Sequence, residues 1–300
     1  MSSPDSPLIS IGEVVDRLRA EFPDVSASML RFFEREGLVV PRRTPGGHRL
    51  YGEAEIERLR RLRRLQRDER LTLAEARQRL DAAAQLPPTP ALARSFLRAA
   101  LDGRAMTARL VILNAAEAGL PLDRLHREVL APALHELGAR WAAGTLSVAQ
   151  EHEVAALARD VLGELAGRVP DPESPRAALV AACAPGELHD LGLRMVATEL
   201  RERGYAVHFL GADVPPDALA HAVRTRTPRA MLLSITRPEC GPALGEAIAA
   251  ARRAAGARAP RILVGGQAAA ALAPQLAAWH AEVVEAPSVA QAVEQALAGA

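Results

Sequence analysis

The stretch Pro185-Gly186-Glu187-Leu188-His189-Asp190-Leu191-Gly192 decides how the chain is interpreted. It follows the apolar run 177–183, which has the length and composition of a buried strand, and it precedes a helical pattern over 193–203. A loop between a strand and a helix is where open α/β sheets bind their ligands. We therefore expect this octet to form the centre of a ligand site.

The residue types in this loop suit a histidine that ligates a metal. His189 supplies the imidazole, and Glu187 can accept the N–H of the other ring nitrogen and so fix the tautomer. Asp190 follows directly, and Gly192 allows a bulky group to approach the backbone. From this octet alone, a polar loop histidine near a helix start is an equally good interpretation.

Two later strands end in residues that belong at the same edge of a sheet. One ends at Ser234 and the other in Gly265 and Gly266, and the carboxyl ends of parallel strands form the ligand crevice. Strands are predicted near 177–183, 206–210, 230–234, 261–264 and 282–285. With helical patterns between them, residues 176–300 are expected to form a flavodoxin-like parallel sheet, a Rossmann-type α/β domain.

The order Glu-x-His-x-x-Gly, then Ser, then Gly-Gly resembles the cobalamin-binding domain of methionine synthase and its relatives. Glu187 stands where most of that family has Asp, so the carboxylate is one methylene longer. The resemblance implies a cobalt corrinoid with His189 as the lower axial ligand of the metal. It also implies a nucleotide tail that runs past Ser234 and Gly265-Gly266.

Residues 8–83 carry the pattern of a helix-turn-helix. A first helix is predicted over 9–20 with Ser10 as its N-cap, and Ser26 caps a second helix that Gly37 ends. Short helices joined by a tight turn make this motif. We expect a small DNA-binding domain at this end of the chain.

A basic hairpin, or wing, is expected after these helices, because Pro45-Gly46-Gly47 forms a turn with basic residues on both sides. Residues 32–51 closely resemble the winged-helix DNA-binding domain of MerR-family regulators. Their positions on the recognition helix and wing make Arg31, Arg42, Arg43, His48, Arg49 and Tyr51 the expected DNA contacts. We interpret at least half of the arginines at 58–64 as part of a solvated helix face rather than as DNA contacts.

The composition is that of ordinary globular domains. The chain is 49% hydrophobic with a net charge of +1, and every basic residue other than histidine is arginine. No apolar run approaches the roughly 20 residues that span a bilayer, and Met1-Ser2-Ser3-Pro4 does not resemble a signal peptide. We expect a cytoplasmic protein with no membrane partner. Cys183 and Cys240 lack metal-ligand spacing, so we expect reduced thiols.

A helical bundle is predicted between these domains. The stretch 85–90 contains three prolines and ends the preceding helix, so the long dimerisation helix of typical MerR proteins is absent from the prediction. Helical patterns then cover 91–101, 104–117, 122–141 and 147–165. Their short connections imply an antiparallel four-helix bundle over 91–168.

Nine residues lie between Trp141, at the end of the third pattern, and Glu151-His152. By physical reasoning alone, a tryptophan at a helix end belongs more often to a core than to a ligand cap. The order of a MerR-type head, a bundle and a cobalamin domain, however, resembles the CarH/CarA/LitR photoreceptor-repressors. In them a Trp and a Glu-His at this spacing cover the upper face of the corrin. The resemblance implies Trp141, Val148, Glu151 and His152 as cofactor contacts.

The family resemblance implies a light-responsive repressor. Its cofactor would be adenosylcobalamin, with methylcobalamin possible, and its partners double-stranded operator DNA and further copies of the chain as a dimer or a dark tetramer. The targets would include carotenoid genes, and light would release the DNA. One departure is Ala142, where the light-sensing type has a histidine. The alternatives are therefore a light-independent cobalamin sensor and, from another class, a corrinoid carrier module of a methyltransferase. We expect no enzyme, because no second catalytic domain is predicted.

Overall fold

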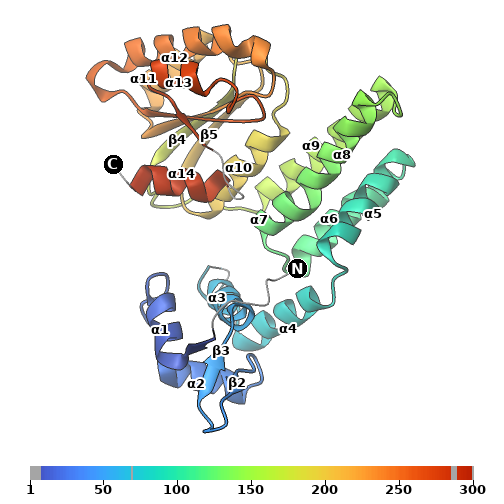
Figure 1. The fold of residues 1–300 in the computed structure, drawn as a ribbon, viewed down its shortest axis with the longest axis vertical. Coiled ribbons are helices and arrows are strands. Elements are labelled where there is room, and N and C mark those ends of the chain that lie inside the picture. The colour runs from blue at the N-terminus through green and yellow to red at the C-terminus, as the bar shows by residue number, and fades with distance from the viewer. Residues whose placement is uncertain (1–7, 69, 285–288, 299–300) are drawn as a thin grey trace. The chain divides into compact units, whose positions relative to one another are not determined.

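The computed structural model describes residues 8–68, 70–284 and 289–298, and Figure 1 shows their fold. By its internal contacts this described part of the chain divides into two compact units. One comprises the residues up to Leu86 together with Glu117–Leu120, and the other comprises Pro87–Ala116 and the residues from Pro121 onward. Over the same residues, no helix is long and apolar enough to cross a membrane.

The N-terminal unit contains the predicted helix-turn-helix. Its elements are β1 (Ile9–Ser10), α1 (Ile11–Arg19), α2 (Ala27–Arg35), β2 (Arg42–Arg43), β3 (Arg49–Tyr51), α3 (Glu53–Asp68) and α4 (Leu73–Ala84). Ser10 and Ser26 are the N-caps of α1 and α2, because each side chain accepts a hydrogen bond from the backbone N–H three residues later. Gly37 follows α2 with a φ of 68°, a left-handed conformation that ends helices. These cap predictions are confirmed.

The predicted wing is the antiparallel pair of β2 and β3, in which Arg43 lies opposite Arg49. A short strand that was not predicted, β1, pairs with the other side of β3, so the described residues form a three-stranded sheet in the order β1-β3-β2. Tyr51 ends β3 and is fully buried in the core with Leu18 and Leu30. The expectation that Tyr51 contacts DNA is therefore corrected, because its side chain offers no surface to a ligand.

The helical part of the second unit follows the predicted patterns closely. Its elements are α5 (Thr89–Leu101), α6 (Ala105–Glu117), α7 (Leu122–Leu125), a π turn η1 (His126–Leu130), α8 (Ala131–Ala142) and α9 (Val148–Gly167). The third pattern is thus interrupted by η1, where the N–H of Ala131 donates to the carbonyl of His126. Pro132 has no N–H for the carbonyl four residues before it, which explains why the α-helical ladder breaks here.

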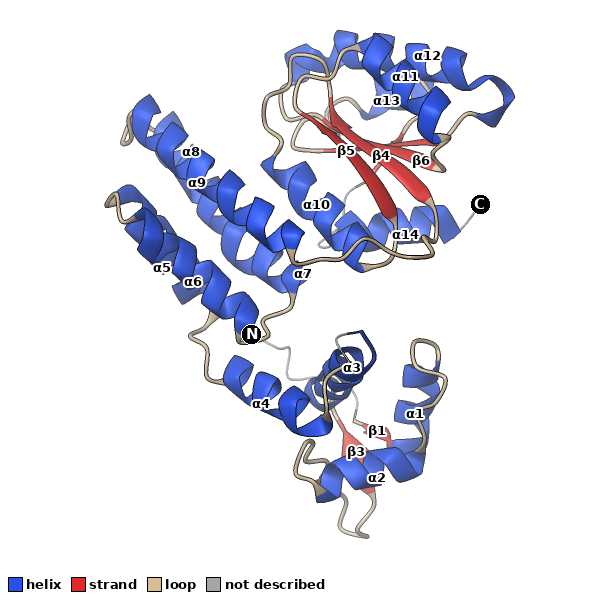
Figure 2. Cartoon of the chain, turned by 180° about the vertical axis from the view of Figure 1, so that it is seen from behind, coloured by secondary structure: helices blue, strands red, loops and turns tan. Residues whose placement is uncertain are grey.

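The rest of the second unit is an α/β sheet with helices on both faces (Figure 2). Its elements are β4 (Ala178–Cys183), α10 (Leu191–Glu202), β5 (Ala206–Gly211), α11 (Pro216–Arg226), β6 (Ala230–Ser234), a 3-10 turn η2 (Pro238–Cys240), α12 (Gly241–Ala255), a 3-10 turn η3 (Gly256–Arg258), β7 (Arg261–Gly265), α13 (Ala273–Ala278), β8 (Glu282–Val283) and α14 (Val289–Ala298). Among the described residues five parallel strands pair in the order β5-β4-β6-β7-β8. The predicted flavodoxin-like order is confirmed.

Both faces of the sheet are covered, which explains the continuous apolar runs of its strands. Side chains of β4 alternate between two cores: Val180 and Ala182 pack with residues of α11 and α12, while Leu179 and Ala181 pack with residues of α10 and α14. The predicted last strand, 282–285, is shorter than expected, because β8 ends at Val283; Glu285 lies outside the described residues.

Strand register brings the predicted site residues to one edge. Cys183 pairs with Ser234, and Ser234 pairs with Gly265, so the carboxyl ends of β4, β6 and β7 are level. The neighbours β4 and β6 are the first and third strands of the sheet along the chain, and such a change in strand order opens a crevice for ligands.

Candidate functional site

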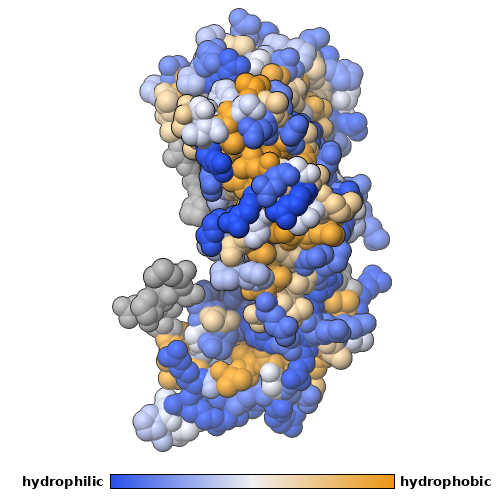
Figure 3. Space-filling model, turned by 90° about the vertical axis from the view of Figure 1, so that its right-hand side faces the viewer, coloured by the Kyte–Doolittle hydropathy of each residue, from blue (hydrophilic) through white to orange (hydrophobic). Residues whose placement is uncertain are grey.

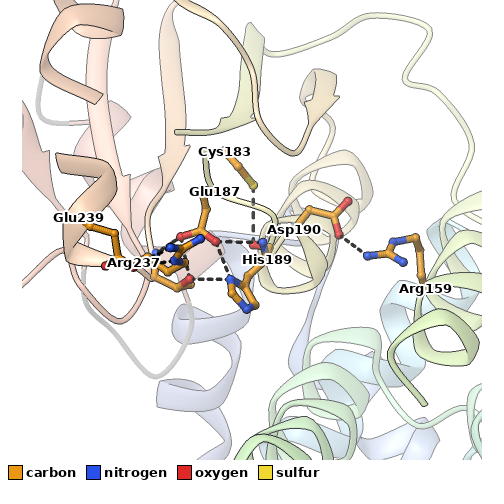
Figure 4. A network of polar contacts seen from close by, with 8 residues as sticks. Arg159, Cys183, Glu187, His189, Asp190, Arg237 and Glu239 are labelled. Carbon is orange, nitrogen blue, oxygen red and sulfur yellow. Dashed lines mark hydrogen bonds and ion pairs between the residues drawn. The ribbon is translucent and has the colours of Figure 1, made fainter. Parts of the chain in front are cut away.

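The loop after β4 is organised around the buried carboxylate of Glu187 (Figure 4). Its Oε1 accepts the backbone N–H of His189 at 2.9 Å and lies 2.5 Å from His189 Nδ1. Its Oε2 accepts the hydroxyl and the backbone N–H of Thr236, both at 2.7 Å, and the N–H of Arg237 at 3.0 Å. The predicted contact between Glu187 and the imidazole is confirmed.

These hydrogen bonds keep Glu187 ionised. Burial alone would raise the pKa of this carboxyl group, but the donors from His189 and Thr236 outweigh it and lower the pKa to about 2. An ionised acceptor 2.5 Å from Nδ1 favours a proton on that nitrogen, and in the neutral imidazole the lone pair then lies on Nε2. The His189 side chain is 66% exposed, and among the described residues none is hydrogen-bonded to Nε2. In that tautomer His189 presents an exposed ring nitrogen of the kind that can ligate a metal.

Thr236 and Arg237 are site residues that the sequence did not predict, although it predicted Ser234 in the same region. Ser234 is buried at the end of β6, whereas Thr236 lies two residues further along and reaches Glu187. The signal that could have identified Thr236 is its position just past the carboxyl end of a central strand, beside the switch point of the sheet.

Asp190 has a structural partner of its own. Its buried carboxylate lies 2.7 Å from Arg194 Nε, one turn along α10, and 3.3 Å from Arg159 Nη2 of α9. In Figure 4 the carboxylate points toward Arg159 and away from the His189 ring. Cys183, the last residue of β4, has its pKa raised to about 12 by burial and by the carboxylates of Asp190 and Glu187, so it is a neutral thiol.

The predicted glycines serve different purposes. A Cβ at Gly192 would meet nothing within 4 Å, so the start of α10 is open to an approaching group. A Cβ at Gly266 would lie 2.3 Å from the carbonyl oxygen of Ile235, and the φ of Gly266 is 105°. Gly266 is thus required for the close approach of two backbones. Gly265 has room for a side chain, with its nearest contact at 3.7 Å.

The tip of the helix pair α8–α9 carries exposed apolar side chains. Trp141 is 49% exposed and Val148 is 56% exposed, so the interpretation of Trp141 as a core residue is excluded. Beside them Glu151 Oε2 lies 2.7 Å from His152 Nδ1. Figure 3 views the molecule from the side of the bundle and shows hydrophobic residues at the surface between hydrophilic ones. No hydrogen bond or ion pair between described residues joins these tip side chains to the His189 loop.

In the N-terminal unit, the wing arginines are tied to the second helix. Glu34 of α2 accepts hydrogen bonds from Arg49 and, at 2.6 Å, from Arg43. The hydrogen bond from Arg49 is the main cause of a lowered pKa for Glu34. Arg31, Arg42 and His48 are exposed. The structure therefore brings the expected DNA contacts, apart from Tyr51, to the surface of α2 and the wing.

The arginines of α3 have acidic partners within the unit. Arg58 pairs with Asp81, Arg60 with Glu21 and Glu57, and Arg63 with Asp24, at N–O distances of 2.5 to 3.1 Å. These three arginines are half-buried in ion pairs, so the expected solvated helix face is not what the structure shows for them.

Family models match the chain in three places. Residues 9–83 match the model described as "MerR HTH family regulatory protein", and residues 92–166 and 177–294 match models described as "B12 binding domain". Among solved structures, the Methanosarcina barkeri monomethylamine corrinoid protein is similar with a TM-score of 0.58 at 17% identity, over 68% of this chain and 96% of that one. At that identity the similarity concerns the fold.

Curated relatives cover most of the chain. The HTH-type transcriptional repressor CarH of Myxococcus xanthus is 34% identical over 70% of this chain and 75% of its own length. The repressor CarA of the same organism is 32% identical over 74% of this chain and 76% of its own. Both relatives are transcriptional repressors with HTH domains rather than enzymes. With its MerR-type unit and its B12-binding regions, this chain belongs to the CarH/CarA family of HTH-type transcriptional repressors.

Proposed function

We propose that the chain is a light-responsive repressor that depends on adenosylcobalamin. It would bind operator DNA as an oligomer in the dark and release it on illumination. The single observation that carries the cobalamin part is the His189 imidazole, whose Nδ1 is held by buried Glu187 while Nε2 faces outward.

The residues present fit a cobalt corrinoid. A metal that already has ring nitrogens as ligands needs one axial donor from the protein, and His189 Nε2 is such a donor with its tautomer fixed. The space beside Gly192 leaves room for a bulky group at the start of α10. Ser234 and Gly265, level at the carboxyl ends of β6 and β7, would flank the nucleotide tail. Asp190 and Gly266 would support this site through backbone and loop structure rather than by direct contact.

The bundle tip supplies the second half of the proposed site. Trp141 and Val148 expose apolar surface, and Glu151 and His152 add polar groups beside it. Exposed tryptophan surface is costly in water and is stabilised when a ligand covers it. When bound, adenosylcobalamin supplies a cobalt–carbon bond that visible light breaks. If the tip contacted the ligand in only one of two bundle positions, the bound ligand would stabilise that position. This follows because a ligand shifts an equilibrium only through contacts that differ between the two states.

DNA binding would use Arg31, Arg42, Arg43, His48 and Arg49 on α2 and the wing. Two copies of the unit are needed to read two half-sites of a duplex. The chain would therefore act as a dimer or a dark tetramer, and changes in assembly would control affinity.

In the decisive experiment, adenosylcobalamin is added to the chain in the dark. The assembly state, and the binding to a DNA fragment from upstream of the gene that encodes this chain, are then measured before and after illumination. We expect a larger assembly and tighter binding in the dark, and the loss of both in light. His189→Ala should abolish the effect of cobalamin on the assembly and alter the absorption spectrum. An unchanged affinity and spectrum for that variant would refute the assignment of His189. Methylcobalamin in parallel tests whether the adenosyl group is required.

A light-independent cobalamin sensor is the second candidate, and Ala142 favours it. This residue is exposed at the end of α8, directly after Trp141, and has no group that could ligate a metal. If cobalamin changes DNA binding equally in the dark and in light, this second function is the correct one.

A further inference from the structure

His126 and Glu199 form a buried polar pair between the helical bundle and the sheet. His126 begins the π turn η1, and Glu199 lies in α10, 73 residues later. His126 Nδ1 is 2.9 Å from Glu199 Oε1, and the residues are only 2% and 7% exposed. Charged and polar side chains are seldom so deeply buried unless they are paired. The pair is thus a specific contact through which bundle and sheet recognise each other.

The contact leaves one ring nitrogen of His126 unsatisfied. Nε2 is buried and has no hydrogen-bond partner among the residues that the structure describes. A neutral ring that donates from Nδ1 buries a lone pair at Nε2, and a protonated ring buries an N–H there. Either state carries the cost of a polar atom removed from water without compensation. Replacement of a buried pair of this kind by apolar residues of similar volume is often neutral or stabilising.

The backbone at His126 is irregular in a way that serves this contact. Pro132 interrupts the α-helical ladder, and the π turn inserts an additional residue between α7 and α8. One additional residue changes the direction of the side chains that follow it by about 100°, since an α-helix has 3.6 residues per turn. Single π turns within α-helices are frequent at functional sites.

Helix α10 joins this pair to the His189 loop. Asp190, directly before α10, is held by Arg159 of α9, and Glu199 is held by His126 further along the same helix. We propose that His126 and Glu199 are positioning residues that seat the bundle on α10, and that the unsatisfied Nε2 of His126 makes this contact weaker than an apolar contact of the same size. This goes beyond the proposed function, because the contact exists without any bound cobalamin.

The test is hydrogen exchange of the full chain without cofactor, read over the segments 122–130 and 191–202. His126→Ala leaves the Glu199 carboxylate buried and unpaired, so we expect exchange in both segments to be faster by about tenfold or more. The single variant Glu199→Gln keeps an oxygen that accepts from Nδ1. Its exchange in both segments should therefore stay near the unmodified rate. The double variant His126→Leu with Glu199→Met removes every unsatisfied atom and should exchange more slowly than the unmodified chain.

Glu164→Gln is the matched control. It removes an ion pair with Arg109 at 2.8 Å that lies within the bundle and does not involve α10, so exchange in both segments should not change. The proposal is overturned if His126→Ala exchanges at the unmodified rate, or if the double variant does not exchange more slowly than the unmodified chain. Should His126→Ala fail to fold, the double variant decides: slower exchange than the unmodified chain supports the proposal, and equal or faster exchange refutes it. A chain that binds no adenosylcobalamin would refute the proposed function and leave this test intact.

Discussion

Replacing Glu187 by Gln tests the reasoning about the His189 loop most directly. A glutamine has one accepting oxygen, so it can serve either the donors of Thr236 and Arg237 or those of His189, and its NH₂ group then faces the others. With the oxygen toward Thr236, the NH₂ group favours the His189 tautomer that is unprotonated at Nδ1. Nε2 would then carry the proton and could not bind a metal.

The loss of unfolding free energy in Glu187→Gln can be calculated in two ways. A hydrogen bond to a charged group contributes about 1.5–3 kcal/mol, and the variant loses the bond from the backbone N–H of His189 and weakens those that remain. Independently, a pKa lowered from 4.5 to about 2 corresponds to about 3 kcal/mol, which we reduce to about 2 kcal/mol because water reaches the loop. We expect Glu187→Gln to lower the free energy of unfolding of the sheet by about 2–3 kcal/mol at neutral pH.

The sign of the pH dependence is fixed by the direction of the pKa shift. A carboxyl group whose pKa is lower in the folded state stabilises that state above pH 4.5, and this contribution is lost as the pH falls toward about 2. The difference between the unmodified chain and the variant should therefore shrink over that range. A difference that grows on acidification would contradict the assignment.

The assay is urea unfolding followed by the fluorescence of Trp279, which packs against the core of the sheet. Because Trp141 is the other tryptophan of the chain, a Trp141→Phe background isolates the signal. With an m value of about 2 kcal/mol/M, the midpoint should fall by about 1 M or more. Glu239→Gln, in an exposed ion pair of 2.7 Å with Arg237, is the control and should change stability by less than about 0.5 kcal/mol. A similarly small effect for Glu187→Gln would refute the reasoning.

Three further outcomes are expected. Gly266→Ala should destabilise the sheet by about 2–4 kcal/mol in the same assay, because its Cβ would meet the Ile235 carbonyl at 2.3 Å, whereas Gly192→Ala should be neutral or slightly stabilising; equal losses would contradict this. Arg43→Ala should weaken binding to all DNA sequences and reduce the slope of log affinity against log salt by about one, and an unchanged slope would remove Arg43 from the interface. Ala142→His should change the absorption spectrum of the illuminated, cobalamin-loaded chain and slow its recovery with fresh adenosylcobalamin; identical spectra and recovery would count against a role for this position.

The sequence by itself determined the features that depend on local pattern. Ser10 and Ser26 were predictable as caps because a cap bonds to residues within one turn. The Glu187–His189 contact was predictable because it spans two residues of one loop. Ser234 and Gly265 could be assigned to the same edge because parallel strands with covered faces align their carboxyl ends.

Only the tertiary structure decided the features that depend on packing between distant segments. Thr236 reaches Glu187 across 49 residues, because β6 pairs beside β4. Tyr51 is buried because β1, too short to show a periodic pattern, closes the wing onto the core. His126 finds Glu199 only through a π turn and the docking of a bundle on α10. The periodicity of a sequence indicates which side of a helix or strand is apolar. The partner of a buried polar group depends instead on strand register and on how segments dock, and neither can be predicted from the local pattern.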